Sequence, residues 1–246
     1  MSQAKEVRLT APSQPAQAKR VRRQVMNFVF YQVDPAWRRI EEGERQRGKE
    51  EFLQVLREYE KTLTLRTYSL VGLRANCDFM LWRIGDSLET FQEMSGRLFK
   101  TGLGKYLTVV HSYLSMAKGS QYLDKVNPEH SEARARITPS NARYIFVYPF
   151  VKRREWYALP LKERQRIMDE HIAVGNRFPS VRLNTSYSFG LDDQEFMLAF
   201  ESDHPEDFLD LVMELRGTEA SSFTEQDTPI FTGISRSFEE MLDLLG

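Results

Sequence analysis

The stretch Tyr68-Ser69-Leu70-Val71-Gly72-Leu73, continued by Phe79-Met80-Leu81-Trp82, decides the fold because a second stretch repeats it. The second copy is Tyr187-Ser188-Phe189-Gly190-Leu191, continued by Phe196-Met197-Leu198-Ala199-Phe200. Each copy predicts a strand, a turn that contains glycine and another strand, followed by a charged amphipathic helix. Such a repeat predicts an architecture built from two copies of one unit. The second copy alone is preceded by a helix with a histidine, His171, so we place the chemistry in that half.

Around each copy the pattern predicts the order strand, helix, strand, strand, helix, strand, which is the ferredoxin-like unit. For the first half we expect strands over 25–33, 63–73, 78–84 and 109–116, and helices over 35–59 and from Ser87. For the second half we expect strands over 144–151, 181–190, 195–201 and 230–234, and helices from Pro160 and over 205–215. Helices cover one face of such a sheet, so the two bare faces must pack together. The sequence therefore predicts an α+β fold, with two fused ferredoxin-like βαββαβ repeats forming a dimeric α/β-barrel-like core.

The chain divides into four segments. We expect a disordered basic tail over 1–22, a first half over 23–123, a linker over 124–142 and a second half over 143–246. The tail lacks the apolar segment of about 7–15 residues that a secretory signal needs. No apolar run approaches the roughly 20 residues of a membrane helix. We therefore expect a cytoplasmic protein without membrane insertion.

Composition narrows the class of function. The 246 residues are 41% hydrophobic, which supports a real core, and the net charge of −1 gives no basic field for nucleic acid. Cys77 is the single cysteine, which excludes an intramolecular disulfide and a thiolate metal cluster.

His171 lies on the apolar side of its helix, four residues after Ile167 and three after Met168. One interpretation is a core histidine that is satisfied by a carbonyl group. The helix offers no second histidine or cysteine at ligand spacing, so a zinc site is excluded. A lone histidine can still be the axial ligand of a haem iron, whose equatorial ligands are porphyrin nitrogens.

A haem site also needs apolar walls and cations for the propionates. The segment Tyr148-Pro149-Phe150-Val151-Lys152-Arg153-Arg154-Glu155-Trp156-Tyr157 supplies both, and Arg136 and Arg143 lie upstream. The alternative is that the charges from Lys152 to Arg154 mark a solvated strand end.

Together these residues resemble the chlorite dismutase-like superfamily, over about Gln24 to Gly233. The segments Tyr148–Lys152, Glu155–Tyr157 and Glu170-His171 are most similar to its coproheme decarboxylase branch, in the actinobacterial form. Three more segments resemble that branch: Val181–Thr185, Leu215–Ala220 and Thr228-Pro229. The resemblance implies two ferredoxin-like halves, a structural first half without haem and a second half that binds haem or coproheme.

The resemblance also implies site residues. His171 matches the iron ligand, and Glu219 matches the acidic residue that holds its imidazole N–H. Tyr148 matches the redox-active tyrosine. The residues that match the porphyrin and propionate contacts are Lys152, Trp156 and, in Arg136-Ile137-Thr138-Pro139, Arg136.

The distal side departs from chlorite dismutases, which carry an arginine there. Counting back from the glycine turn gives Leu183, and counting forward from His171 gives Asn184. The adjacent Arg182 would point to the opposite face unless a bulge re-aims it. The distal histidine of the actinobacterial enzymes has no clear match, because Lys118 lies near that place and His111 comes too early.

The implied activity is a coproheme decarboxylase. Its substrate and redox centre would be iron coproporphyrin III, its oxidant hydrogen peroxide and its product haem b, with Tyr148 removing a β-hydrogen from a propionate. The resemblance further implies a homopentamer and a ferrochelatase as the coproheme donor. The alternatives are a haem b chlorite dismutase or peroxidase, and a non-enzymatic haem-binding protein.

Overall fold

In the computed structural model of the protein, residues 23–120, 122 and 136–246 are described. The predicted tail and most of the predicted linker lie outside them. The first half contains β1 (Val25–Val33), η1 (Pro35–Arg39), α1 (Glu42–Tyr59), β2 (Thr64–Ser69), β3 (Phe79–Gly85), α2 (Leu88–Leu98), η2 (Leu103–Tyr106) and β4 (Leu107–Met116). The second half contains β5 (Tyr144–Lys152), α5 (Arg154–Ala158), α6 (Leu161–Gly175), β6 (Arg182–Tyr187), β7 (Phe196–Ser202), α7 (Pro205–Arg216), η4 (Glu219–Phe223), β8 (Thr224–Gln226), β9 (Phe231–Arg236) and α8 (Phe238–Asp243).

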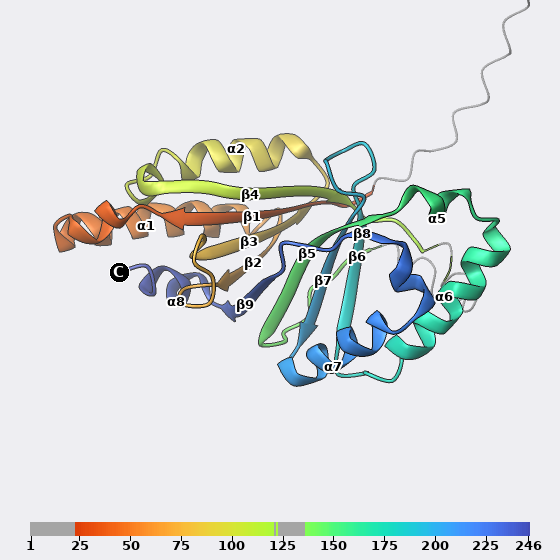
Figure 1. Ribbon diagram of the computed structural model, residues 1–246. Coiled ribbons are helices and arrows are strands. Elements are labelled where there is room, and N and C mark those ends of the chain that lie inside the picture. The colour runs from red at the N-terminus through yellow and green to blue at the C-terminus, as the bar shows by residue number, and fades with distance from the viewer. Residues whose placement is uncertain (1–22, 121, 123–135) are drawn as a thin grey trace, which may run out of the picture.

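These strands form one sheet whose ends meet (Figure 1). The order is β7-β6-β4-β1-β3-β2-β9-β5-β8, and a further pairing of β7 with β5 closes the ring and leaves β8 outside it. Within the ring, both halves have the same ferredoxin-like order, β4-β1-β3-β2 in the first half and β9-β5-β7-β6 in the second. The predicted fold of two fused ferredoxin-like repeats around a barrel-like core is therefore confirmed.

The two glycine turns are built alike. Gly72 and Gly190 both adopt the left-handed backbone, with φ of 74° and 72°, which glycine reaches without steric cost. The backbone N–H groups that follow them close equivalent turns, Leu73 onto Leu70 and Leu191 onto Ser188. Counted from the glycines, Ser69 rather than Tyr68 corresponds to Tyr187, one residue away from the alignment read from the sequence.

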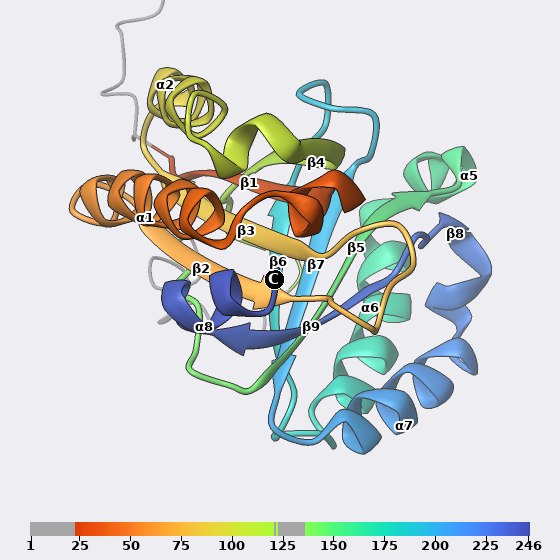
Figure 2. The ribbon, with the colours of Figure 1, turned by 90° about the vertical axis from the view of Figure 1, so that its left-hand side faces the viewer.

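Strand alternation separates two faces of the barrel wall. The inward-pointing residues form one buried cluster that includes Phe28, Trp82, Val147 and Met197. The outward-pointing residues pack under helices, which lie outside the strands in both halves (Figure 2). Every strand of the ring therefore presents one face to the barrel interior and the other to a helix layer.

Several predicted boundaries were wrong for local reasons. The single helix expected over 35–59 is divided, because Asp34 caps η1 and Ile40 is extended before Glu41 caps α1. The strands expected over 63–73 and 181–190 end at Ser69 and Tyr187, where the turns begin. The elements α5, η4, β8 and α8 were not predicted, and α8 extends the chain beyond the last expected strand.

Candidate active site

The helix-facing side of the second half carries a row of side chains across three strands. Tyr148 on β5 pairs with Leu198 on β7, which pairs with Thr185 on β6. Directly opposed residues of antiparallel strands lie on the same face. Tyr148 is buried and stacks on Phe200 with ring centroids 5.9 Å apart. Burial raises the pKa of the Tyr148 phenol, so it keeps its proton at neutral pH.

Lys152 lies at the end of β5, beside Trp156. Both residues were expected to contact the porphyrin or its propionates, and the structure brings them together. The ammonium Nζ is 4.4 Å from the centroid of the Trp156 ring and donates a hydrogen bond of 3.1 Å to the carbonyl oxygen of Ala220. Burial lowers the pKa of Lys152 to about 8, against the opposing effect of Glu195. The group is therefore largely charged at neutral pH, with one side against an aromatic face.

His171 lies on α6, half-buried, with its Nδ1 3.4 Å from the hydroxyl of Thr218. Thr218 donates its own hydroxyl proton to the carbonyl oxygen of Leu215 at 2.7 Å. The hydroxyl must therefore accept from His171, which puts the imidazole proton on Nδ1 and the free lone pair on Nε2. Burial, with a contribution from Lys152, lowers the pKa of His171 to about 4. The ring is neutral at pH 7, as an iron ligand must be.

The expected pair between Glu219 and His171 is not formed in this structure. Arg166, on α6 before His171, donates two hydrogen bonds of 3.0 and 2.8 Å to the Glu219 carboxylate. Both bonds come from one guanidinium nitrogen, Nη2, which also donates to Glu163. The side chain that meets the imidazole is the neighbouring Thr218.

The described end of the linker is anchored to the barrel. Gln24 exchanges two hydrogen bonds with the backbone of Ile137, and the buried carboxylate of Glu201 accepts from the Ser140 N–H. Arg136 is exposed beside this anchor. Within the described residues no contact joins Arg136 to Tyr148 or Lys152, so its role stays a prediction.

The register separates the two candidates for the distal position. Leu183 pairs with Phe200 and faces the helix side, whereas Asn184 pairs with Ala199 and faces the barrel interior. Asn184 is buried there and donates a hydrogen bond of 2.7 Å to Glu201. Strand alternation therefore turns Asn184, one of the two candidates for the distal position, away from the side that carries Tyr148. The pairing of β6 with β7 is continuous, so no bulge re-aims Arg182.

Alternation also decides between the two candidates for a distal base. His111 pairs with Phe30, and its ring lies 5.1 Å from that of Phe231, inside the barrel. Lys118 reaches the other face, with its Nζ 5.6 Å from the centroid of the Tyr187 ring. Among these two, Lys118 is the one on the side of Tyr148 and Leu183.

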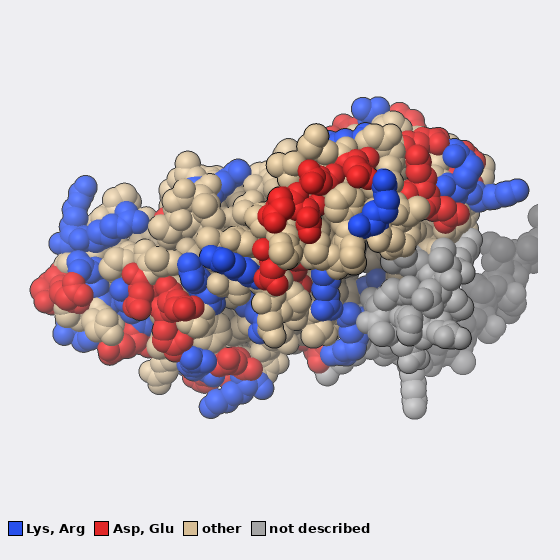
Figure 3. All heavy atoms as spheres, turned by 90° about the horizontal axis from the view of Figure 1, so that it is seen from below, with Lys and Arg blue, Asp and Glu red and all other residues tan. Residues whose placement is uncertain are grey.

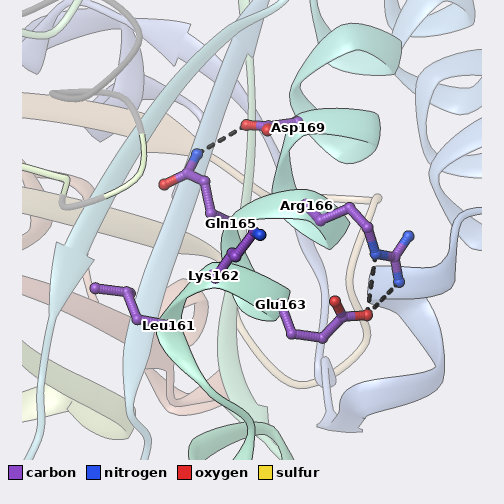
Figure 4. Close-up of a pocket in the computed structure, with 6 residues that line it drawn as sticks. All are labelled: Leu161, Lys162, Glu163, Gln165, Arg166 and Asp169. Atoms are coloured by element: carbon purple, nitrogen blue, oxygen red, sulfur yellow. Dashed lines mark hydrogen bonds and ion pairs between the residues drawn. The ribbon is translucent and has the colours of Figure 1, made fainter.

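Two hollows run along α6. One of ≈ 570 Å³ is lined by Leu161, Lys162, Glu163, Gln165, Arg166 and Asp169, and one of ≈ 400 Å³ by Asp169, Ile172, Ala173 and Asn176. Figure 4 shows Leu161 and Gln165 pointing away from the Glu163–Arg166 pair. Neither hollow is lined by His171 or Tyr148. Their volumes fall within the range of small-molecule sites, about 300–1,000 Å³.

Two residues of this region, Glu195 and Tyr157, escaped sequence reasoning. Glu195, just before β7, is 6% exposed, and its Oε2 accepts from the hydroxyl of Tyr157 at 2.5 Å and from the Lys152 N–H at 2.8 Å. A charged residue beside a strand gives no signal of burial, so the sequence could not reveal this contact.

The residues fit an iron porphyrin. Within the described chain no cluster of three metal-ligating side chains exists, so His171 would hold an iron whose remaining ligands come from elsewhere. The helix-facing wall near Tyr148 is aromatic, and Lys152 supplies a cation for a carboxylate. Across the face seen in Figure 3 charges of both signs are interspersed, in keeping with the net charge.

Comparison with known sequences places this chain. A sequence profile described as Chlorite dismutase matches residues 45–236. The chain belongs to the chlorite dismutase family. The coproheme decarboxylase of Mycolicibacterium smegmatis (strain ATCC 700084 / mc(2)155) is 37% identical over 177 residues, which are 71% of this chain and 74% of that protein.

Solved structures share the fold. Chlorite dismutase from Candidatus Nitrospira defluvii, in complex with imidazole, superimposes with a TM-score of 0.82 at 24% identity, over 89% of this chain and 94% of that one. A haem-binding protein from Thermus thermophilus gives a TM-score of 0.82 at 26% identity, over 92% of this chain and 96% of that one. In the described part of the present chain, no helix is long and apolar enough to cross a membrane.

Proposed function

We propose that the protein is a coproheme decarboxylase, which uses hydrogen peroxide to convert iron coproporphyrin III to haem b. The observation that carries the proposal is the helix side of the second half, which holds Tyr148 and Lys152 on β5 and a neutral His171 on α6 whose pKa is lowered in part by the Lys152 charge. The identity of 37% to the Mycolicibacterium smegmatis enzyme supports the same assignment.

The bound iron porphyrin would supply the redox chemistry, passing on the two oxidising equivalents of peroxide. The Nε2 lone pair of His171 would hold the iron, because Nδ1 carries the proton. Lys152 and Arg136 would hold propionates as charge-assisted donors, and Trp156 would form a wall. Leu183 would line the distal side, with Lys118 on the same side of the sheet.

Tyr148 takes the hydrogen atom. Its buried phenol keeps its proton at neutral pH, so it can lose an electron and a proton together and then remove a β-hydrogen from a propionate. Each propionate loses carbon dioxide, one proton and two electrons to become a vinyl group. Each peroxide takes up two electrons and two protons to become two waters. The propionate supplies both electrons and one of the protons, and solvent supplies the other proton.

The main alternative is a chlorite dismutase, which would carry a distal arginine. In this chain the helix-facing distal position is Leu183, an apolar side chain that offers no donor to an anion. We therefore prefer the decarboxylase.

The test is to add ferric coproporphyrin III to the apoprotein, titrate in hydrogen peroxide and follow the porphyrin mass. Two successive losses of carbon dioxide that end at haem b are expected. Tyr148→Phe should bind the substrate with unchanged affinity and leave its mass unchanged, and a fully active variant would remove the radical role. Binding without any mass change in the wild type would turn the assignment to chlorite-dependent oxygen evolution, and then to a haem-binding protein.

By the same resemblance we propose a cytoplasmic homopentamer that receives coproheme from a ferrochelatase. Light scattering of the purified protein tests the assembly, since a pentamer of 28.8 kDa chains differs clearly from a monomer.

A further inference from the structure

Tyr157 donates a hydrogen bond to the buried carboxylate of Glu195, and the proposed reaction as described so far gives this pair no role. Its hydroxyl donates to Glu195 Oε2 at 2.5 Å, and Glu195 is 6% exposed. The second oxygen, Oε1, is buried without a hydrogen bond, and Arg154 lies 3.7 Å from it. A carboxylate with an unfilled oxygen keeps its capacity to accept a proton.

Tyr148 has a different environment. Within residues 23–120, 122 and 136–246 no hydrogen-bond partner meets the Tyr148 hydroxyl, although the ring itself is buried against Phe200. A phenol that loses an electron becomes a very strong acid and must pass its proton to a base within hydrogen-bond reach. Among the residues that the structure describes, Tyr157 has such a base in the ligand-free protein and Tyr148 has none.

We infer that Tyr157 is a second oxidisable tyrosine of this site and that Glu195 is the base that accepts its proton. The inference rests on the proposed function, because peroxide acting at the iron porphyrin supplies the oxidant. Tyr157 would give one of the two electrons that the reduction of peroxide at the bound porphyrin requires. Its O–H bond breaks as an O–H bond forms on Glu195 Oε2, leaving a neutral phenoxyl radical beside a neutral carboxylic acid.

The location of Tyr157 connects it to the proposed site. It packs in one small cluster with Trp156 and with Ile167 and Met168 of α6, one turn before His171. The same Glu195 oxygen that accepts its proton also accepts the Lys152 N–H, so the pair lies directly behind the propionate-binding segment. Burial and the bond to Glu195 raise the pKa of Tyr157, which keeps the proton in place until the electron leaves.

The pair also explains why the two tyrosines would serve together. A propionate gives up two electrons, whereas one tyrosyl radical stores one. Tyr157 would hold the second oxidising equivalent of a peroxide while Tyr148 acts on the substrate, and a second electron from the substrate would restore Tyr157 with the proton returning from Glu195.

The test is rapid-freeze electron paramagnetic resonance after peroxide is added to the ferric coproporphyrin complex, with ring-deuterated tyrosine identifying tyrosyl signals. The variants are Tyr157→Phe, Glu195→Gln and, as a matched control, Tyr106→Phe, a half-buried tyrosine of the first half. We expect the wild type to show two tyrosyl components. Tyr157→Phe should remove one of them and Tyr106→Phe neither, and Glu195→Gln should form that component about a hundredfold more slowly because the base is lost.

A signal that is unchanged in Tyr157→Phe, or that is equally fast in Glu195→Gln, overturns the inference. So does a wild type in which a spin trap captures radical at Tyr148 alone or at no tyrosine. The same measurement on protein loaded with haem b separates this result from the proposed function. A Tyr157 radical there, with a coproporphyrin mass that never changes, would keep the inference and remove the decarboxylase.

Discussion

The two halves repeat one unit, yet the outer face of the second half is less completely covered. In the first half, Leu65 of β2 is 5% exposed under the helices, and at the equivalent position of the second half Leu183 of β6 is 48% exposed. The same register equates the buried Val29 with Tyr148. Helix α1 buries three large side chains, Phe52, Val55 and Leu56, whereas in α6, all of whose residues are described, Ile167 alone is fully buried.

The difference teaches where a duplicated fold can place a ligand. Full burial of a leucine stabilises a protein by about 1.5–3 kcal/mol, and the second half forgoes much of that along one face of its sheet. The first half can bear the stability of the barrel because its outer cluster is closed by aromatic side chains, among them Trp37, Phe79 and Phe91. Under the proposed function, a large planar ligand would lie against this face of the second half.

The largest effect should follow from His171→Ala. Loss of the axial ligand should lower the affinity for ferric coproporphyrin by more than about a hundredfold, beyond what loss of an outer partner costs. Titration by the Soret band measures it, with His204→Ala, an exposed histidine of the same half, as the control. Equal affinity of the two variants would mean that the porphyrin does not bind at His171.

The packing difference itself can be tested by truncation. Leu65→Ala should lower the free energy of unfolding by about 3 kcal/mol, the usual cost of a cavity in a closed core. Leu183→Ala, at the matched position, should cost less than about 1 kcal/mol because the side chain is half-exposed already. Urea unfolding of both variants provides the comparison. Similar losses would show that the two faces are packed alike in solution.

The sequence revealed the fold through local signals. The strand over 25–33 was predicted with the observed bounds, because a mainly apolar and aromatic run ends at Asp34-Pro35. The helix α8 could have been found from Ser237 and Glu240, which form a capping box in the structure. The short strand β8 offers three residues and no apolar pattern, so it gave no signal.

The sequence could suggest which single residues belong to the candidate site. It could not show which side chains contact one another or which face of a strand a residue occupies. The contact of Lys152 with Trp156 follows from their closeness in sequence at a strand end, and the structure brings them together. The choice between Leu183 and Asn184 needed the register of β6 against β7, which one sequence does not contain. The partner of Glu219 depended on Arg166 reaching it from another helix, a contact over 53 residues of sequence.

A smaller effect concerns the positive charge of Lys152. Burial lowers the pKa of Lys152 to about 8, so the ammonium is present below that pH and lost above it, while the substrate carboxylates stay ionised throughout. Coproporphyrin affinity should therefore fall about tenfold as the pH rises through about 8 to 10, the worth of one charge-assisted hydrogen bond. Lys152→Gln should flatten this profile, and Lys162→Gln, on the exposed side of α6, should not. A wild-type affinity that is constant over this range would show that Lys152 binds no propionate.

The smallest effect distinguishes the contributions of Thr218 and Glu219, the two polar residues near His171, to porphyrin binding. Thr218→Val keeps the shape of the buried side chain but removes the oxygen that accepts the imidazole Nδ1–H, so the ring becomes less basic. The affinity for ferric porphyrin should fall about tenfold, with a shift of the iron–histidine stretching frequency in resonance Raman spectra. Thr218→Ser should restore both. Glu219→Gln should change neither, because its carboxylate is occupied by Arg166. If Glu219→Gln has the larger effect instead, the imidazole exchanges Thr218 for Glu219 when iron binds, and the pair with Arg166 is the arrangement of the ligand-free protein.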